Sequence, residues 1–159
     1  MTAGSVSAAQ LNPIITFALF LTRQQSFIKM LFIWAAQLSG ALVGTALMHF
    51  YWSQLLPVEL KLFCLVLPNT PKVSTIFAAE ATSGFLLIVV LLGVLDKARP
   101  YPFNADVSIH APAMAIAAVH SVNVFIAGPI SGNSMNPARA LAPAILAGFK
   151  DFGFVVSLH

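Results

Sequence analysis

Long apolar runs, separated by short stretches rich in proline and polar residues, dominate the chain. Three of these runs are long enough to cross the hydrocarbon core of a bilayer as helices, which takes about 20 residues. We therefore predict spanning helices over residues 27–50, 73–96 and 107–130. Residues 51–72 contain three prolines and an apolar core that is too short to span, and the pattern predicts a loop on the outer side of the membrane.

Two shorter apolar stretches, residues 12–23 and 136–149, each begin with an Asn-Pro pair. Asparagine suits the N-cap of a helix, and proline suits its first position because the missing N–H would be unpaired there anyway. At a rise of 1.5 Å per residue, each stretch covers about half a membrane. We interpret both as half-helices that enter the membrane without crossing it.

The two Asn-Pro pairs lie in similar surroundings. "SAAQLNPIITFALFL" from Ser7 aligns with "SGNSMNPARALAPAI" from Ser131. One such pair is common in turns, but two that each open a short apolar helix favour a duplicated unit over coincidence. Paired discontinuous helices place a site near the bilayer midplane, where irregular backbone is tolerated only inside protein or beside a cavity.

Composition agrees with a membrane protein and excludes several other classes. Of the 159 residues, 58% are hydrophobic and 8% charged, with a mean hydropathy of +0.88, which leaves too little polar surface for a soluble globule. The net charge of +3 is spread singly, so nucleic acid is not expected as a partner. The single cysteine, Cys64, and the lack of a His/Glu cluster with metal-ligand spacing predict no metal site and no cofactor.

The chain resembles the aquaporin family, the major intrinsic proteins, whose signature is two Asn-Pro-Ala boxes. The resemblance rests on "NPI" at 12–14, "AAQLSGALVGTAL" at 35–47, "AAE" at 78–80 and "AGPISGNSMNPARALAPAIL" at 127–146. The run from Ile130 to Phe152 is most similar to the aquaporin-eight subgroup. The box residues are Pro13 and Ile14 in the first repeat and Pro137 and Ala138 in the second.

This resemblance implies an all-α membrane fold, an inverted-repeat bundle of six spans and two re-entrant half-helices. Three full spans are recognisable in the sequence, so the first two and most of the sixth are expected to be missing, with residues 152–159 as the start of a truncated span. The implied function of the full-length protein is passive conduction of water or small neutral solutes, including ammonia, hydrogen peroxide and glycerol. A homotetramer in a plasma or intracellular membrane is also implied.

The pore chemistry can be assigned to particular residues through the resemblance. Asn12 and Asn136 are expected to donate their side-chain N–H groups to the passing solute while their carbonyl oxygens cap the half-helices. Two helix N-termini that meet also place partial positive charges at one point, which repels cations, including hydronium. Capping alone is the alternative role for these asparagines.

Arg139 and Glu80 are the charged residues placed at membrane depth. A guanidinium there is costly and by default marks a functional site, and the resemblance implies a cation-excluding filter at the outer mouth. A structural ion pair is the alternative. Glu80 is instead expected to brace the irregular segment around Asn133 and Ser134 by accepting its backbone N–H groups.

Family spacing from Asn136 places two further filter positions, Val124 and Asn133. Valine, where strict water channels present histidine, suggests a wider filter, and the fourth position would lie on a missing span. Ile14 departs from the alanine of the family box and adds bulk where the half-helices meet. Gln10 replaces a histidine common in the family, and His120 is either a gate or a packed residue.

Two other classes of function give different expectations for this sequence. A truncated, nonconducting partner that co-assembles with intact aquaporins is the alternative to a channel. An intramembrane enzyme would need a nucleophile and a base close together, which the sequence does not indicate. We therefore predict no enzymatic activity.

Overall fold

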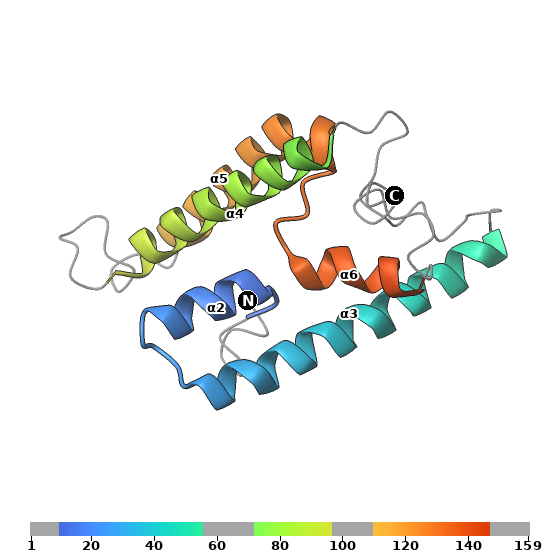
Figure 1. Cartoon of the computed structure of the whole chain (residues 1–159), viewed down its shortest axis with the longest axis horizontal. Helices are drawn as coiled ribbons and strands as arrows, with labels where there is room; N and C mark the ends of the chain where they lie inside the picture. Colours follow the sequence, from blue (N-terminus) through green and yellow to red (C-terminus); the bar gives the residue numbers. More distant parts are fainter. Residues whose placement is uncertain (1–9, 56–71, 97–109, 147–159) are drawn as a thin grey trace. The chain divides into compact units, whose positions relative to one another are not determined.

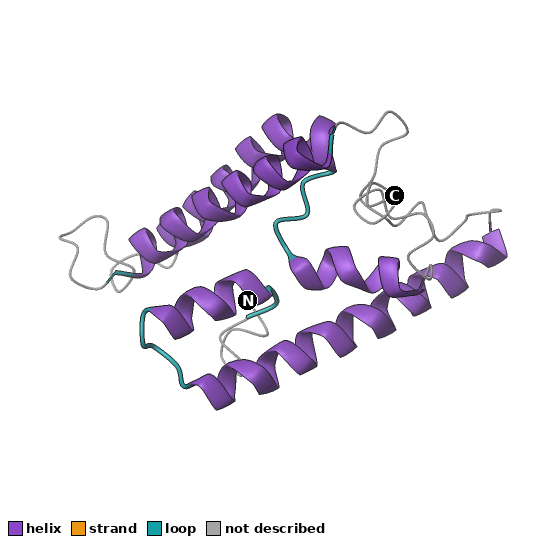
Figure 2. Cartoon of the chain, viewed as in Figure 1, coloured by secondary structure: helices purple, strands orange, loops and turns teal. Residues whose placement is uncertain are grey.

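Helices are the only regular elements in the residues that the structure describes. A computed structural model describes the structure of residues 10–55, 72–96 and 110–146 (Figure 1, Figure 2). Along these residues lie α2 (Pro13–Leu21), α3 (Phe27–Leu55), α4 (Val73–Leu95), α5 (His110–Ser131) and α6 (Pro137–Leu146). The predicted all-helical class is confirmed.

Three of these helices are long and apolar enough to cross a membrane. The candidate spans are Phe27–Gln54, Ser74–Val94 and Ala113–Ser131, with mean hydropathies of 1.6, 2.1 and 1.7. The other two, α2 and α6, have 9 and 10 residues. They are therefore too short to cross a bilayer core of about 30 Å.

Helix α3 is longer than the sequence predicted. It continues to Leu55, past residue 50 where the prediction ended the span. The additional residues, Tyr51 to Leu55, include no helix breaker, and the first proline after them is Pro57. Much of the predicted outer loop (56–71), together with 107–109, 147–149 and 152–159, lies outside the described residues.

The first half-helix ends earlier than predicted, at Leu21 rather than residue 23, because the chain turns sharply there. Arg23 has a φ of 60°, a left-handed conformation that is uncommon for any residue except glycine. Its N–H donates to the Phe20 carbonyl at 2.9 Å, and Gln24 N–H donates to the Leu19 carbonyl at 2.9 Å. This pair of bonds is the Schellman arrangement that closes helix C-termini.

The described helices fall into two compact units. The first contains α2, α3 and α6, and the second contains α4, α5 and the segment up to Met135. In the first unit the two short helices lie along the much longer α3, which packs against both (Figure 1). The N-terminal turns of α2 and α6 are also in contact.

In the second unit α4 and α5 pack side by side (Figure 1). Their contact buries Leu87 of α4 and Ala127 of α5. A polar bond joins the same faces, since the side-chain amide of Asn123 donates to the Ser83 carbonyl at 2.9 Å. Most other large side chains of α5 remain exposed, as expected for a helix that has lipid or further protein around it.

Candidate functional site

The first half-helix begins with a side-chain cap. Asn12 has extended backbone angles, φ −135° and ψ 120°, and its Oδ1 accepts the Ile14 N–H at 3.0 Å. Pro13 occupies the first helical position, where a donor is not needed. Asn12 is 7% exposed, so the asparagine is held almost completely inside the protein.

The second half-helix begins in the same way. Oδ1 of Asn136 accepts the N–H groups of Ala138 at 3.0 Å and Arg139 at 3.3 Å. Pro137 is the first residue of α6. Both Asn-Pro pairs therefore have the same local structure, in which the side-chain oxygen satisfies N–H groups that the helix leaves unpaired.

The two helix starts are linked directly. Nδ2 of Asn136 donates to the Leu11 carbonyl at 3.0 Å, across 125 residues of sequence. The positive ends of two helix dipoles consequently lie close together in this unit. The sequence predicted that this amide would donate to solute, so the bond to Leu11 is an additional partner that pattern alone did not indicate.

Helix α3 holds the first half-helix through side-chain donors. The Trp34 indole N–H donates to the Pro13 carbonyl at 3.1 Å. Nε2 of Gln37 lies 2.8 Å from both the Gln10 carbonyl and the Thr16 hydroxyl. Gln10 thus contributes its backbone here, while its Oε1 is buried without a partner among the described atoms.

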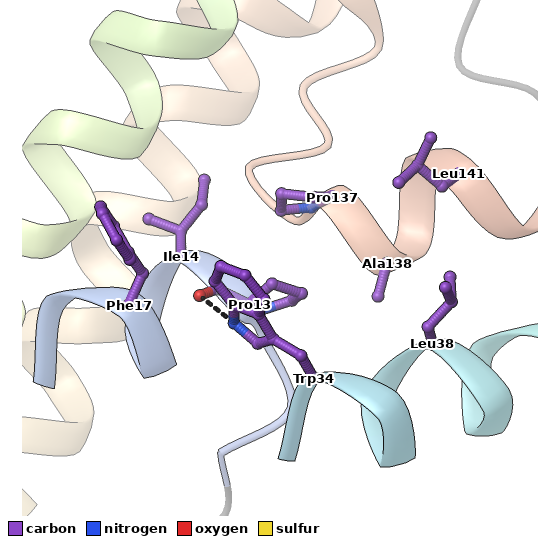
Figure 3. A pocket seen from close by; sticks show the side chains of 8 residues that line it. All are labelled: Pro13, Ile14, Phe17, Trp34, Leu38, Pro137, Ala138 and Leu141. Atoms are coloured by element: carbon purple, nitrogen blue, oxygen red, sulfur yellow. Dashed lines mark hydrogen bonds between the residues drawn. The ribbon is translucent and has the colours of Figure 1, made fainter. Parts of the chain in front are cut away.

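Box residues line an apolar hollow of about 370 Å³ in the first unit (Figure 3). Its walls come from α2, α3 and α6 and comprise Pro13, Ile14, Phe17, Trp34, Leu38, Pro137, Ala138 and Leu141. Ile14 is one of these lining residues, together with Pro137 and Ala138 of the second box. Because the lining is apolar, the hollow cannot itself supply the hydrogen bonds that a polar solute needs.

The four residues before α6's cap form an irregular segment in the second unit. Gly132, Asn133 and Met135 have φ values of 77°, 50° and 48°, all left-handed. Two of them are not glycine, so surrounding contacts must hold this backbone. Buried N–H groups in such a segment need acceptors, because neither a helix nor water supplies them.

Glu80 of α4 supplies these acceptors. Its Oε1 accepts the Ser134 N–H at 2.9 Å and the Ser131 hydroxyl at 2.6 Å, and its Oε2 accepts the Met135 N–H at 2.9 Å. The sequence predicted that Glu80 would accept backbone N–H groups around Asn133 and Ser134. The Asn133 N–H does not donate to Glu80 but to the Ser131 hydroxyl, at 3.1 Å.

Val124 and Asn133, two of the predicted filter residues, also belong to the second unit. Val124 is 52% exposed on α5. The Asn133 side chain is only 1% exposed, and neither its Oδ1 nor its Nδ2 has a partner in the described structure. An unpaired buried amide costs free energy, so this side chain needs a water or solute partner.

Asn123 was missed by sequence reasoning. It is 1% exposed and donates through Nδ2 to Met135 Sδ at 3.0 Å as well as to the Ser83 carbonyl. It therefore connects α4, α5 and the irregular segment. The sequence feature that could have identified Asn123 is its position in the middle of an apolar span, where a polar side chain must find a partner.

Arg139 lies on the exposed side of α6 in the first unit. Residues 10–55 and 136–146, the described part of this unit, contain no Asp or Glu. Pro143, one turn later, also lacks the N–H that would bond the Arg139 carbonyl in a regular helix.

These groups are hydrogen-bond donors and acceptors beside an apolar wall. Within residues 10–55, 72–96 and 110–146, no three His, Cys, Asp or Glu side chains are grouped for a metal ion. What the first unit offers is a pair of capped helix starts, an exposed guanidinium and an apolar wall. Such features define a class of membrane protein that holds discontinuous helices inside a bundle.

Comparison with known proteins identifies the family. The model for the major intrinsic proteins matches residues 1–156. "Probable aquaporin TIP2-2" of Oryza sativa subsp. japonica is 32% identical over 145 residues, covering 91% of this chain and 53% of that protein. "Aquaporin-2" of Rattus norvegicus is 31% identical over 150 residues, covering 93% and 52%.

The chain belongs to the major intrinsic protein family, a family of multi-pass integral membrane channels and not of enzymes. It spans about half the length of the curated relatives it matches. "Probable aquaporin NIP4-2" of Arabidopsis thaliana is also similar, 33% identical over 147 residues, covering 92% of this chain and 48% of that protein. These relatives do not single out the aquaporin-eight subgroup, so that finer assignment stays a prediction.

Proposed function

We propose that the protein conducts water and small neutral solutes passively across a membrane. One observation carries this proposal: two half-helices, each capped by the asparagine of an Asn-Pro pair, meet at their N-termini, with Asn136 bonded to the Leu11 carbonyl at 3.0 Å. Aligned dipoles at this point repel cations, while side-chain amides can orient a neutral molecule. Family membership supports the same function.

Arg139 is proposed as the charged part of the selectivity filter, with Val124 and Asn133 as two further members. The support for Arg139 is its exposure in a unit whose described residues contain no acidic partner. An exposed guanidinium can donate to a polar solute and repel a cation. The buried, unpartnered amide of Asn133 can satisfy a solute in the same way.

The solute range is proposed to extend beyond water to ammonia, hydrogen peroxide and glycerol, as the aquaporin-eight subgroup assignment also implies. Support comes from the modest size and apolar character of Val124. A wider, less polar filter lowers the discrimination against molecules larger than water. Ile14 is proposed to narrow the path for solutes, because it adds bulk beside Pro137 where the half-helix starts meet.

Glu80 is proposed as a structural brace and not as a solute contact. Its two carboxylate oxygens already accept three hydrogen bonds, from Ser131, Ser134 and Met135. Such bonds to a carboxylate are stronger than neutral ones. The brace therefore fixes the irregular segment whose Asn133 is a filter residue in this proposal.

A swelling assay tests the function. The protein encoded by the complete reading frame that contains this sequence, called the complete protein below, is placed in proteoliposomes and followed by stopped-flow light scattering. We expect water permeability well above that of empty liposomes, and strong loss in Arg139→Glu, which puts an anion at the filter. Gln54→Glu, at the exposed end of α3, is the matched control. Permeability equal to empty liposomes contradicts the proposal.

The complete protein is further proposed to form a homotetramer, as the family resemblance implies. Gly40 and Gly44 give α3 a face of small residues, and a Cβ at either position would meet no atom within 4 Å. Small residues one turn apart allow close approach of another helix. Native mass spectrometry measures the assembly, and a monomer in mild detergent contradicts it. The alternative is that this truncated chain is a nonconducting partner that assembles with intact aquaporins. Coexpression that leaves the abundance, trafficking and permeability of the intact channel unchanged contradicts that alternative.

A further inference from the structure

The turn between α2 and α3 carries two basic side chains in the first unit. Arg23 lies within the turn, and Lys29 is in the first turn of α3. Both residues are exposed. Residues 10–55 contain no Asp or Glu. This segment of the chain therefore carries two positive charges close together and no negative charge.

Local contacts fix the backbone of this turn. The Arg23 N–H donates to the Phe20 carbonyl at 2.9 Å, and the Lys29 N–H donates to the Ser26 hydroxyl at 3.3 Å. The ring centroids of Phe20 and Phe27 are 5.8 Å apart, which joins the end of α2 to the start of α3. The two basic side chains therefore leave the backbone at fixed, neighbouring positions, and a ligand does not have to order the turn in order to bind.

The length of α3 indicates the depth of this turn in a membrane. Tyr51 and Trp52, near the other end of the helix, are exposed aromatic residues of the kind that lie at a membrane interface. From Lys29 to Tyr51 the helix rises by about 33 Å, compared with about 30 Å for a hydrocarbon core. With the aromatic residues at one interface, Lys29 lies at the other, at the level of the lipid headgroups.

Exposed apolar side chains accompany the two charges. Leu21, Phe27 and Ile28 are 62%, 54% and 67% exposed. They suit the acyl region below a headgroup, while the long stem of Lys29 lets its ammonium reach out to the headgroup itself. A guanidinium can bind phosphate through two N–H groups, and an ammonium adds a point charge. The combination fits a phospholipid better than a soluble anion, which has no apolar part.

We propose that the turn with Arg23 and Lys29 binds the headgroup of an anionic phospholipid, whose acyl chains lie beside the exposed apolar residues. A zwitterionic headgroup offers the same phosphate together with a positive group, which two basic side chains disfavour. The net negative charge of an anionic headgroup is therefore what this turn selects. The attraction weakens as salt screens it, and it does not depend on conduction.

Native mass spectrometry of the complete protein measures the lipid preference. The protein in mild detergent receives equal amounts of phosphatidylglycerol and phosphatidylcholine with the same acyl chains, and the ratio of the two bound lipids is determined. We expect wild type to bind more phosphatidylglycerol. Arg23→Gln and Lys29→Gln should each lower the ratio by about fivefold, the usual effect of one basic residue near an anionic surface. Equal binding of both lipids by wild type overturns the proposal.

Control variants separate this site from a diffuse charge effect and from misfolding. Lys72→Gln removes one exposed charge beside α4 in the other unit and should keep the wild-type ratio. The double variant Arg23→Lys, Lys29→Arg retains both charges and should keep it as well. A loss in either control, or an unchanged ratio when both charges at 23 and 29 are removed, contradicts the proposed site.

Inorganic phosphate distinguishes a lipid headgroup from a soluble anion. It is added to the wild-type protein at constant ionic strength, so that screening does not change. We expect phosphatidylglycerol to remain bound, because its acyl chains also contact the protein. Displacement of the lipid by phosphate would show that the two basic residues bind soluble anions and would overturn the proposal.

Discussion

Nδ2 of Asn136 donates to the Leu11 carbonyl at 3.0 Å, which joins the starts of two half-helices that are far apart in the sequence. Asn136→Asp keeps an oxygen for the helix cap but replaces the donor by an acceptor facing that carbonyl. We expect destabilisation of about 0.5–1.5 kcal/mol, the usual effect of one lost hydrogen bond. Thermal unfolding in detergent measures it, and Gln54→Glu controls for the amide-to-acid change itself.

Removal of one carboxylate oxygen at position 80 should loosen the irregular segment. Glu80→Gln leaves a single acceptor oxygen where three donors now bind, so at least one N–H or O–H loses its partner. The expected loss is about 1–3 kcal/mol for each such group, with a lower unfolding temperature. Glu80→Asp keeps the charge but shortens the side chain, and should be intermediate. An unchanged unfolding temperature in Glu80→Gln would exclude a bracing role.

Replacement of Arg23 by glycine should stabilise the first half-helix. The left-handed φ of 60° costs a non-glycine residue roughly 1 kcal/mol, which glycine avoids. Arg23→Ala is the matched control, because it removes the same charge and keeps the strained conformation. The unfolding temperature of Arg23→Gly should exceed that of Arg23→Ala. Equal unfolding temperatures for the two variants would mean that the left-handed φ at position 23 costs no free energy.

The amide of Asn123 should be needed for α4–α5 packing. Asn123→Leu is similar in volume but leaves the irregular segment without the contact at Met135 Sδ. The Ser83 carbonyl keeps its place in α4, so we expect a modest loss of about 0.5–1.5 kcal/mol, typical of one hydrogen bond. Ser121→Ala, exposed on the same helix, is the control. Greater stability in Asn123→Leu would show that apolar packing suffices here.

Local signals made much of the fold predictable. Long apolar runs indicate the spans by length alone, and each Asn-Pro pair carries a cap and a first helical residue within two positions. The end of α3 was harder to place, since Tyr51 and Trp52 are compatible with either a helix or an interfacial loop. The left-handed turn at Arg23 was not predictable from the sequence, because glycine is the residue that usually occupies that position.

The contacts of the site depended on tertiary structure. Asn12 and Asn136 were recognisable as helix caps, but the bond from Asn136 to Leu11 arises only when both half-helices lie along α3. The left-handed conformations of Asn133 and Met135 are likewise imposed by surrounding contacts and not by their own preferences. Asn123 looked like one more polar residue in a span until its two partners were known.

The indole of Trp34 offers a use outside transport. Its N–H is bonded to the Pro13 carbonyl, and its ring lies 6.1 Å from that of Phe17. The chain contains one other tryptophan, Trp52, which is 41% exposed near the end of α3. In a Trp52→Phe background, the emission of Trp34 becomes an intrinsic optical reporter of whether the first half-helix is seated on α3.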